Sequence, residues 1–266
     1  QSSTLYKLRQ MPINTLEVKF EKSTKAKAIN AALNSLPDSF DNVVILDADN
    51  IIEKDFLLKL AYEFLEGHLA VQGHRTAKNI NTNIAIVDAI SEEINNTIFC
   101  KGPQLIGLSS RLIGSGMGFN YNLFKDIMKD INAVGGFDKE LEIKLLEHEI
   151  KIKYVDNALI YDEKVSTSDV MLKQRTRWIS SQFYFMRKYF LSGLGELFHY
   201  GNLDYFNKTI QLIILPRAYM LIALTISVIL AFISKNTFFI YTTTLLISFY
   251  LFSFIVIDKK AYKQMN

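Results

Sequence analysis

The chain has 266 residues, which is enough for one sizeable hydrophobic core with at most a small appendage. Its formal net charge of +3 comes without a long basic run, so nucleic acid is not an expected partner. Cys100 is the only cysteine, which excludes an intrachain disulfide and a cysteine-based zinc site, and the four histidines lack metal-ligand spacing.

The first 205 residues alternate between strand and helix patterns. Strands are predicted at 15–20, 42–46, 69–72 and 151–155, and helices at 3–10, 25–36, 56–65, 84–98 and 139–147. This alternation predicts an α/β fold with a mainly parallel sheet and helices on both faces. Such a sheet usually begins with a strand–helix–strand unit, whereas this chain opens with a helix and a lone strand. We therefore expect N-terminal strands to be missing.

Asp47 and Asp49 directly follow the apolar run 42–46, which suits a strand buried on both faces of a sheet. Ligands of open α/β sheets bind at the carboxyl ends of strands. Two neighbouring carboxylates repel each other unless a cation neutralises them. Carboxylate oxygens suit Mg²⁺ or Mn²⁺, with substrate phosphates completing the shell. A turn or a helix cap is the alternative interpretation.

Two further segments have the composition of a ligand site. Gly114 and Gly116 lie in a glycine-rich stretch that lacks the dinucleotide-binding pattern, because Phe119 takes the place of the third glycine. Glycines there would let the backbone approach a ligand closely, although a simple turn has the same composition. Asp138 and Glu140 begin a predicted helix, where they suit the helix dipole or supply a general base.

Gln174, Arg177 and Trp178 form a pattern of amide, cation and aromatic ring. The amide and the guanidinium can hydrogen-bond sugar hydroxyls or phosphate oxygens, and the indole offers an apolar face to a sugar ring. Trp178 is the only tryptophan of the chain. An anchor at a membrane interface is the alternative interpretation of this pentapeptide.

The C-terminal part is strongly apolar, since Arg217 and Lys235 are the only charged residues between positions 210 and 257. About 20 apolar residues cross a bilayer core, so we predict transmembrane helices at about 214–233 and 238–257. Flanking basic residues place the rest of the chain in the cytoplasm. The segment 183–209 is predicted to be amphipathic and interfacial, or else a plain surface helix. A buried hairpin of a soluble protein is the alternative for the apolar pair.

These motifs, in this order, resemble family 2 glycosyltransferases of the cellulose synthase and hyaluronan synthase type, over about residues 15–260. The resemblance implies a GT-A-like, Rossmann-like fold and an inverting mechanism. It implies a cytoplasmic catalytic domain over residues 1–182, the interfacial segment, and a membrane part over residues 210–266. The expected location is a membrane, such as the bacterial inner membrane. The first strand of that family and its nucleotide-contacting acid are not visible here.

The resemblance also implies roles for individual residues. Asp47 would bind the donor diphosphate and Asp49 would hold Mg²⁺ or Mn²⁺ with Asp47. Lys27 stands in a segment, 25–30, similar to the family's Gly-Lys-Ala-x-Ala-Leu-Asn and would contact the nucleotide. The remaining implied contacts are Arg177 on the nucleotide-sugar and, around the acceptor, Gly114, Gly116, Gln174 and Trp178.

The catalytic base of that family is commonly the Asp of a Thr-Glu-Asp motif that precedes Leu-Glu-Leu. Here Asp138, Lys139 and Glu140 precede Leu-Glu-Ile, so Glu140 takes the place of the base, with an arm longer by one methylene. A displacement of about 1 Å matters in such a site. Asp138 is the competing candidate.

The resulting hypothesis is inverting transfer from a nucleotide-sugar, expected to be a UDP-sugar, to a hydroxyl of a glycan or lipid-linked acceptor. Membrane lipids and other membrane subunits are expected partners. The alternative is a non-catalytic nucleotide-sugar-binding or regulatory subunit of a polysaccharide synthesis or export complex. Two membrane segments without an intramembrane acid argue against a channel or transporter. Processive synthesis and single addition both remain open.

Overall fold

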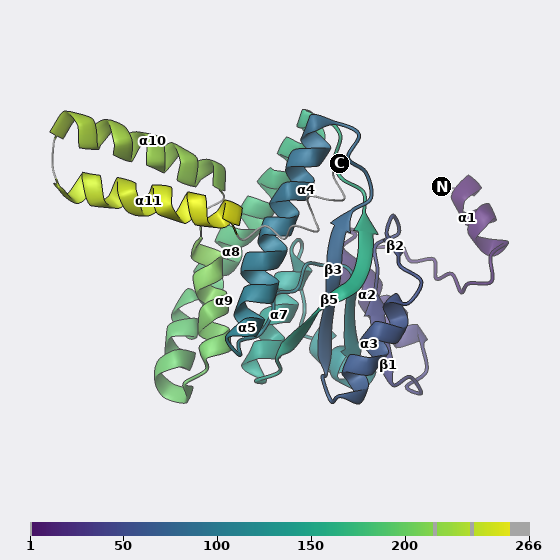
Figure 1. The fold of residues 1–266 in the computed structure, drawn as a ribbon. Coiled ribbons are helices and arrows are strands. Elements are labelled where there is room, and N and C mark those ends of the chain that lie inside the picture. Colours follow the sequence, from purple (N-terminus) through teal and green to yellow (C-terminus); the bar gives the residue numbers. More distant parts are fainter. Residues whose placement is uncertain (1, 215–216, 235–236, 256–266) are drawn as a thin grey trace.

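The computed structural model describes residues 2–214, 217–234 and 237–255. The core of the fold is a five-stranded sheet in the order β1-β4-β3-β5-β2. Figure 1 shows its neighbouring strands β3 and β5. The strands are β1 (Asn42–Ile45), β2 (Ile51–Ile52), β3 (Ala70–Ala77), β4 (Met117–Asn120) and β5 (Ile152–Asp162).

The sheet is mixed, so the prediction of a mainly parallel sheet is wrong. Only β3 and β5 pair in parallel, whereas β1–β4, β3–β4 and β2–β5 are antiparallel. After β3 the chain passes through α4, η1 and α5 and returns to the carboxyl ends of β1 and β3. There Gly116 N donates to Ile45 O (2.9 Å) and Gly116 O accepts from Gly73 N (2.8 Å). From this point β4 runs between β1 and β3, antiparallel to both.

The helices follow the predicted pattern closely in the first half of the chain. Helices predicted at 25–36, 56–65 and 139–147 are confirmed, and the one predicted at 84–98 is α4, continued by the short π-helix η1. The bounds are α1 (Ser2–Arg9), α2 (Lys25–Ser35), α3 (Phe56–Leu65), α4 (Asn83–Asn95), η1 (Asn96–Lys101), α5 (Gly102–Leu105), α6 (Tyr121–Met128), α7 (Phe137–Glu147), α8 (Ser168–Tyr200), α9 (Leu203–Ile213), α10 (Arg217–Ser234) and α11 (Thr237–Ile255).

The prediction of a strand at residues 15–20 is wrong. Residues 14–20 have no regular structure, and most of their side chains are exposed. The β-propensity of this stretch is expressed only when a neighbouring strand supplies hydrogen bonds and packing, and none of the described strands pairs with it.

Helices cover both faces of the sheet, as predicted. Alternation along β1 and β3 sends Val43 and Ala70 to one hydrophobic cluster, with Phe119, α6 and α7. It sends Val44 and Val71 to the other cluster, which α3 covers. The run 42–46 is only half-buried, because β1 lies at the edge of the sheet and not inside it.

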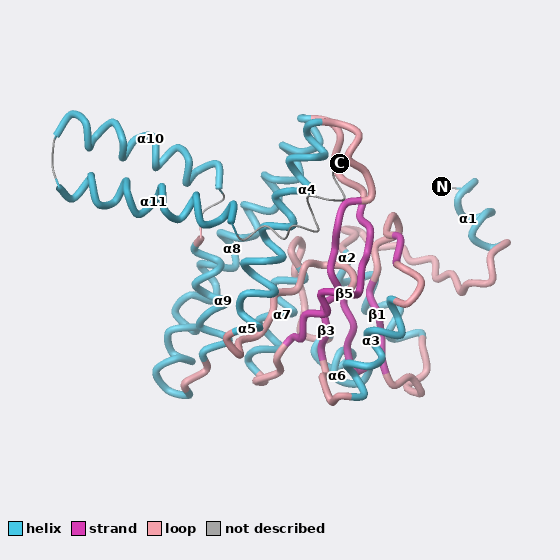
Figure 2. Tube along the Cα trace, viewed as in Figure 1, coloured by secondary structure: helices cyan, strands magenta, loops and turns pink. Residues whose placement is uncertain are grey.

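Beyond the sheet, the chain forms long helices. α8 is continuous for 33 residues and runs through positions 182 and 183, where the catalytic domain was predicted to end. It stops at Gly201, which adopts the left-handed conformation that glycine tolerates (φ 68°). Figure 2 shows the predicted interfacial segment, 183–209, as the second half of α8 and the start of α9.

α10 and α11 form an antiparallel pair that extends away from the sheet (Figure 1). Across the described ranges, no helix reaches both the length and the apolar character needed to traverse a membrane. The prediction of transmembrane helices at 214–233 and 238–257 is therefore not confirmed. Residues 215–216 and 256–257 of those segments lie outside the described part of the chain.

Candidate active site

The site begins at Asp47, just beyond the carboxyl end of β1. Its carboxylate forms an ion pair with Lys25 Nζ, which also donates a hydrogen bond to Gly114 O (2.8 Å). Lys25 is the first residue of α2, whose start is capped by Thr24: the Thr24 hydroxyl accepts from Lys27 N (3.2 Å). The side chains of Lys25 and Asp47 remain 34% and 39% exposed, so a ligand can reach the pair.

The structure brings Lys25, and not the predicted Lys27, to Asp47. Lys27 Nζ donates instead to Lys22 O (3.3 Å) at the surface. Residues two apart on a helix point about 200° apart, so both lysines cannot face the same carboxylate. A signal was present in the sequence, because Lys25 aligns with the lysine of the family's Gly-Lys-Ala segment and Lys27 aligns with its variable position.

The turn that presents the two acids is held by Asn50, which sequence reasoning missed. Asn50 Oδ1 accepts from Asp47 N (3.2 Å), and Asp47 N also reaches Ser115 Oγ (2.9 Å). Asn50 Nδ2 donates to Asp162 Oδ1 (2.9 Å) and to Asp49 Oδ1 (3.3 Å). Asparagine is common in turns because its amide can bond the nearby backbone, and that was the only signal available.

The two predicted glycines have different positions. Both have positive φ, 87° for Gly114 and 65° for Gly116. Gly114 belongs to the site, since a Cβ there would lie 3.8 Å from Asp138 Cγ. Gly116 lies inside the sheet, where a Cβ would come within 3.1 Å of Ile160 Cγ2. Gly116 therefore serves the strand arrangement and does not face the site.

The start of α7 also borders the site. Lys25 Nζ lies 5.2 Å from the centre of the Phe137 ring, and Asp138 lies beside Gly114. The side chains of Lys25, Asp47 and Asp138 therefore gather around the backbone of Gly114. This cluster, together with Gly114, is called the β1 site below.

Glu140 is not brought to the β1 site, contrary to its predicted role as the base. It is buried, and its carboxylate accepts from Lys188 Nζ (2.7 Å) and from Asn132 N (3.2 Å). Tyr189 OH adds a third bond of 3.3 Å. Because two helical positions differ by about 200°, the side that carries Glu140 faces away from Asp138. The geometry places Asp138 at the β1 site.

The predicted amide, cation and tryptophan lie on α8. Gln174 Oε1 is buried without a hydrogen-bond partner, and Arg177 is exposed. Trp178 stacks under Arg175, whose guanidinium lies 4.8 Å from the ring centre and pairs with Asp88 of α4. Among the described residues, no hydrogen bond or ion pair joins the three predicted side chains to Asp47 or Asp49.

A network of buried charges connects α4 to the turn of the β1 site. Arg75 Nε donates to Glu92 Oε1 (2.6 Å), and Lys164 pairs with both Glu92 and Asp162. Burial by itself would raise the pKa of Asp162, but Arg75 and Lys164 lower it overall. Asp162 therefore stays ionised and accepts from Asn50.

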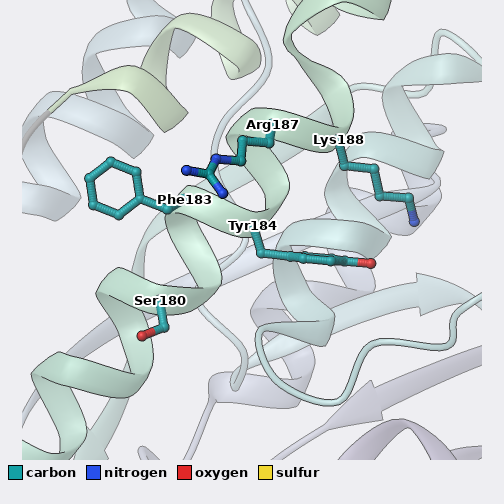
Figure 3. A pocket seen from close by; sticks show the side chains of 5 residues that line it. All are labelled: Ser180, Phe183, Tyr184, Arg187 and Lys188. Carbon is teal, nitrogen blue, oxygen red and sulfur yellow. The ribbon is translucent and has the colours of Figure 1, made fainter.

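The second half of α8 borders an open surface depression of about 420 Å³ that is lined by Ser180, Phe183, Tyr184, Arg187 and Lys188. Phe183 and Arg187 extend together to one side of the helix, and Lys188 extends to the other (Figure 3). Lys188 is the lysine that holds Glu140. This depression belongs to the segment that the sequence predicted to be amphipathic.

The side chains of the β1 site supply only part of the ligands that a divalent metal needs. Mg²⁺ in nucleotide sites commonly takes one or two protein carboxylates together with substrate phosphates, and Asp47 and Asp49 supply such a pair. Within the described residues, no group of three or more His, Cys, Asp or Glu side chains is placed to hold a metal. The residues present therefore fit a metal that arrives with a phosphate-bearing substrate.

Ligands of open α/β sheets bind at the carboxyl ends of strands, and the β1 site, with its acids and a lysine, lies at such an end. The family model described as glycosyl transferase family group 2 matches residues 42–257, which is more than half of the chain. The chain belongs to that family, and its mixed sheet fits a GT-A-like domain. It is therefore a glycosyltransferase. No individual curated protein gave a match.

Proposed function

We propose that the chain transfers a sugar from a UDP-sugar to a hydroxyl of a glycan or lipid-linked acceptor by a single inverting displacement. The observation that carries this proposal is the convergence of Lys25, Asp47 and Asp138 on Gly114 in a family group 2 glycosyltransferase. Lys25 would bind a phosphate of the donor, and the Asp138 carboxylate would take the proton of the attacking hydroxyl.

The remaining predicted residues complete this proposal. Asp49, with Asp47, would hold Mg²⁺ or Mn²⁺, which neutralises charge on the departing diphosphate. Arg177 would approach the diphosphate from α8. Gln174 would border the acceptor, because its buried Oε1 has no hydrogen-bond partner of its own. Trp178 would lie beside it.

The proposal extends to location and subtype. The described side chains of α10 and α11 include many exposed apolar residues, among them Leu221, Ile222, Ile229, Phe232 and Leu245. Extended apolar surfaces of this kind mark contacts with membranes or partners. We place the α10–α11 pair at a membrane, with the β1 site on the cytoplasmic side, in polysaccharide or glycolipid synthesis of the cellulose or hyaluronan synthase type.

The test is turnover by the purified protein with a panel of UDP- and GDP-sugars and Mn²⁺, with the product sized in the same assay. Asp138→Asn should lower transfer at least a hundredfold while donor affinity changes little, because only the proton acceptor is lost. Glu140→Gln is the matched control and should keep most transfer.

Three outcomes would contradict the proposal. Near-normal transfer by Asp138→Asn would remove Asp138 from catalysis, and loss of transfer in Glu140→Gln alone would restore the sequence-based choice. Donor binding without transfer to any acceptor would instead favour a non-catalytic, nucleotide-sugar-binding subunit.

A further inference from the structure

Lys139 is a buried cation whose ammonium group forms no ion pair within the described part of the chain. It lies in the first turn of α7, one residue beyond Asp138, and only 8% of it is exposed. Among the described residues, no carboxylate lies within ion-pairing distance of its ammonium group. Its one hydrogen bond, to Ser181 Oγ, is long at 3.5 Å. A buried ammonium group is costly unless it is paired.

The surroundings of Lys139 are also positive. A Cβ on Gly136 would lie 3.4 Å from Lys139 Nζ, so the ammonium folds back over the N-terminus of the helix. That end of the helix carries partial positive charge, and Gly136 has no side chain to cap the first amides. Burial lowers the pKa of Lys139, the charge of Asp138 raises it in part, and the positive charges of Arg111 and Arg177 lower it further.

Nearby acids offset this charge only in part, because the pKa of Lys139 stays lowered despite the negative charges of Asp138 and Glu142. The buried carboxylate of Glu142 accepts from Lys208 Nζ (2.5 Å) and from Leu112 N (3.0 Å). The ion pair of Glu142 is therefore with Lys208, and Glu142 acts on Lys139 only through its charge. Arg111 adds a buried Nε without a hydrogen-bond partner.

We propose that the N-terminus of α7, with Lys139 and Ser181, binds a phosphate group of the substrate. A phosphate offers several acceptor oxygens to the amides of Phe137 and Asp138, the ammonium and the hydroxyl, whereas Lys139 N already donates to Gly136 O (3.0 Å). Phe137, the first residue of α7, already contacts Lys25, so this phosphate would lie next to the β1 site. The identification of the ligand as a diphosphate of a nucleotide-sugar rests on the proposed function.

The variant that tests the proposal is Lys139→Met, which removes the charge and keeps an unbranched apolar side chain. Without ligand, the Tm of this variant should rise, because an unpaired buried cation is gone. Its affinity for UDP, measured by calorimetry without metal, should fall at least tenfold. Lys139→Arg should retain much of the affinity, and Lys129→Met is a matched control at an exposed lysine (65%) that should change neither property.

The phosphate has two possible sources, which the probes separate. Inorganic pyrophosphate and UDP represent the donor, and a short-chain lipid phosphate in detergent represents the acceptor. Lys139-dependent binding of UDP and pyrophosphate supports the donor. Lys139-dependent binding of the lipid phosphate alone supports a phosphate site for the acceptor.

The proposal is overturned if Lys139→Met binds all three probes as tightly as the unchanged protein does. It is also overturned if the unliganded variant has a lower Tm and unchanged affinity, since Lys139 would then be a structural residue. Its failure is distinguishable from failure of the proposed function. If Lys139→Met transfers sugar and binds UDP normally, only the proposal of a phosphate site at Lys139 is rejected. If pyrophosphate binding depends on Lys139 but the protein transfers no sugar, only the proposed function is rejected.

Discussion

At the scale of single residues, the β1 site depends on which lysine of α2 faces Asp47. Lys25 occupies the first helical position, where its side chain can reach back to the turn after β1 and to Gly114 O. The side chain of Lys27 points to nearly the opposite side of the same helix, and its Nζ donates to the backbone oxygen of Lys22. A separation of two residues therefore distinguishes a contact with Asp47 from a contact at the surface.

Lys25→Met should weaken UDP binding by roughly ten- to a hundredfold, because a hydrogen bond to a charged group contributes about 1.5–3 kcal/mol. Calorimetric titration with UDP would measure this loss. Lys27→Met is the matched control and should bind UDP normally. The reverse result, with Lys27→Met impaired and Lys25→Met unchanged, would restore the choice made from sequence.

At the scale of elements, the close packing of α8 against α9 depends on Gly193. A Cβ at this position would overlap the side chain of Thr209 on α9. Gly195, two residues further along the same helix, has no neighbouring atom within 4 Å of its Cβ position. The two glycines thus share one helix and differ in their tertiary environment.

Gly193→Ala should lower the free energy of unfolding by about 1–3 kcal/mol, since overpacking outweighs the gain in helix propensity. Gly195→Ala should raise it by up to about 1 kcal/mol, because only the propensity changes. Urea unfolding of both variants measures the difference. Equal effects at the two positions would show that α9 does not pack on α8 as described.

Another connection between elements is made by His74 on β3. Its Nδ1 lies 3.1 Å from Asp156 Oδ1 on β5, and its Nε2 lies 3.0 Å from Glu93 Oε2 on α4. Burial by itself would lower the pKa of His74, but the bonds to Asp156 and Glu93 raise it to about 9. The protonated imidazole therefore joins two strands and a helix.

This shift predicts a pH dependence with a definite sign. The folded pKa of about 9 lies above the ordinary value of 6.5, so the stabilisation is complete below pH 6.5 and is lost as the pH rises through 9. The full contribution is about 3 kcal/mol. The difference in unfolding free energy between the protein and His74→Gln should shrink over this range. The exposed His199→Gln is the control, and a constant difference for His74→Gln would contradict the ion pairs.

At the scale of the whole molecule, two parts with different surfaces share one chain. The part around the sheet has two buried hydrophobic clusters, one on each face. The α10–α11 pair extends from it, joined internally by contacts such as Ser227 Oγ to Thr243 Oγ1 (2.8 Å), and exposes large apolar side chains. Such a distribution suits catalysis on one part and attachment through the other.

The membrane proposal predicts the effect of charges on that pair. Ile222→Lys combined with Ile229→Lys should reduce co-sedimentation with lipid vesicles at least severalfold, since charged side chains enter an apolar phase poorly. Leu65→Lys adds a charge at an exposed apolar position of α3 and should leave sedimentation unchanged. Equal vesicle binding by the double variant and the unchanged protein would count against attachment through α10–α11.

The sequence by itself was sufficient to predict the features that depend on local pattern. Helical periodicity located α2, α3 and α7, and the apolar run located β1 and hence Asp47 and Asp49 at its end. The order of motifs indicated the family, which the family match confirms. These predictions succeed because propensity, periodicity and motif order are properties of short segments.

Only the tertiary structure decided the direction of β4, the choice of Lys25 over Lys27 and the place of Asp138 beside Gly114. Each of these depends on contacts between segments far apart in the chain. The direction of β4 depends on the end of the sheet to which the connecting segment returns. The direction of a helical side chain depends on how its helix is rotated relative to a distant neighbour. Glu140 matched the family position of the base, yet Lys188, some 48 residues away in the chain, holds its carboxylate elsewhere.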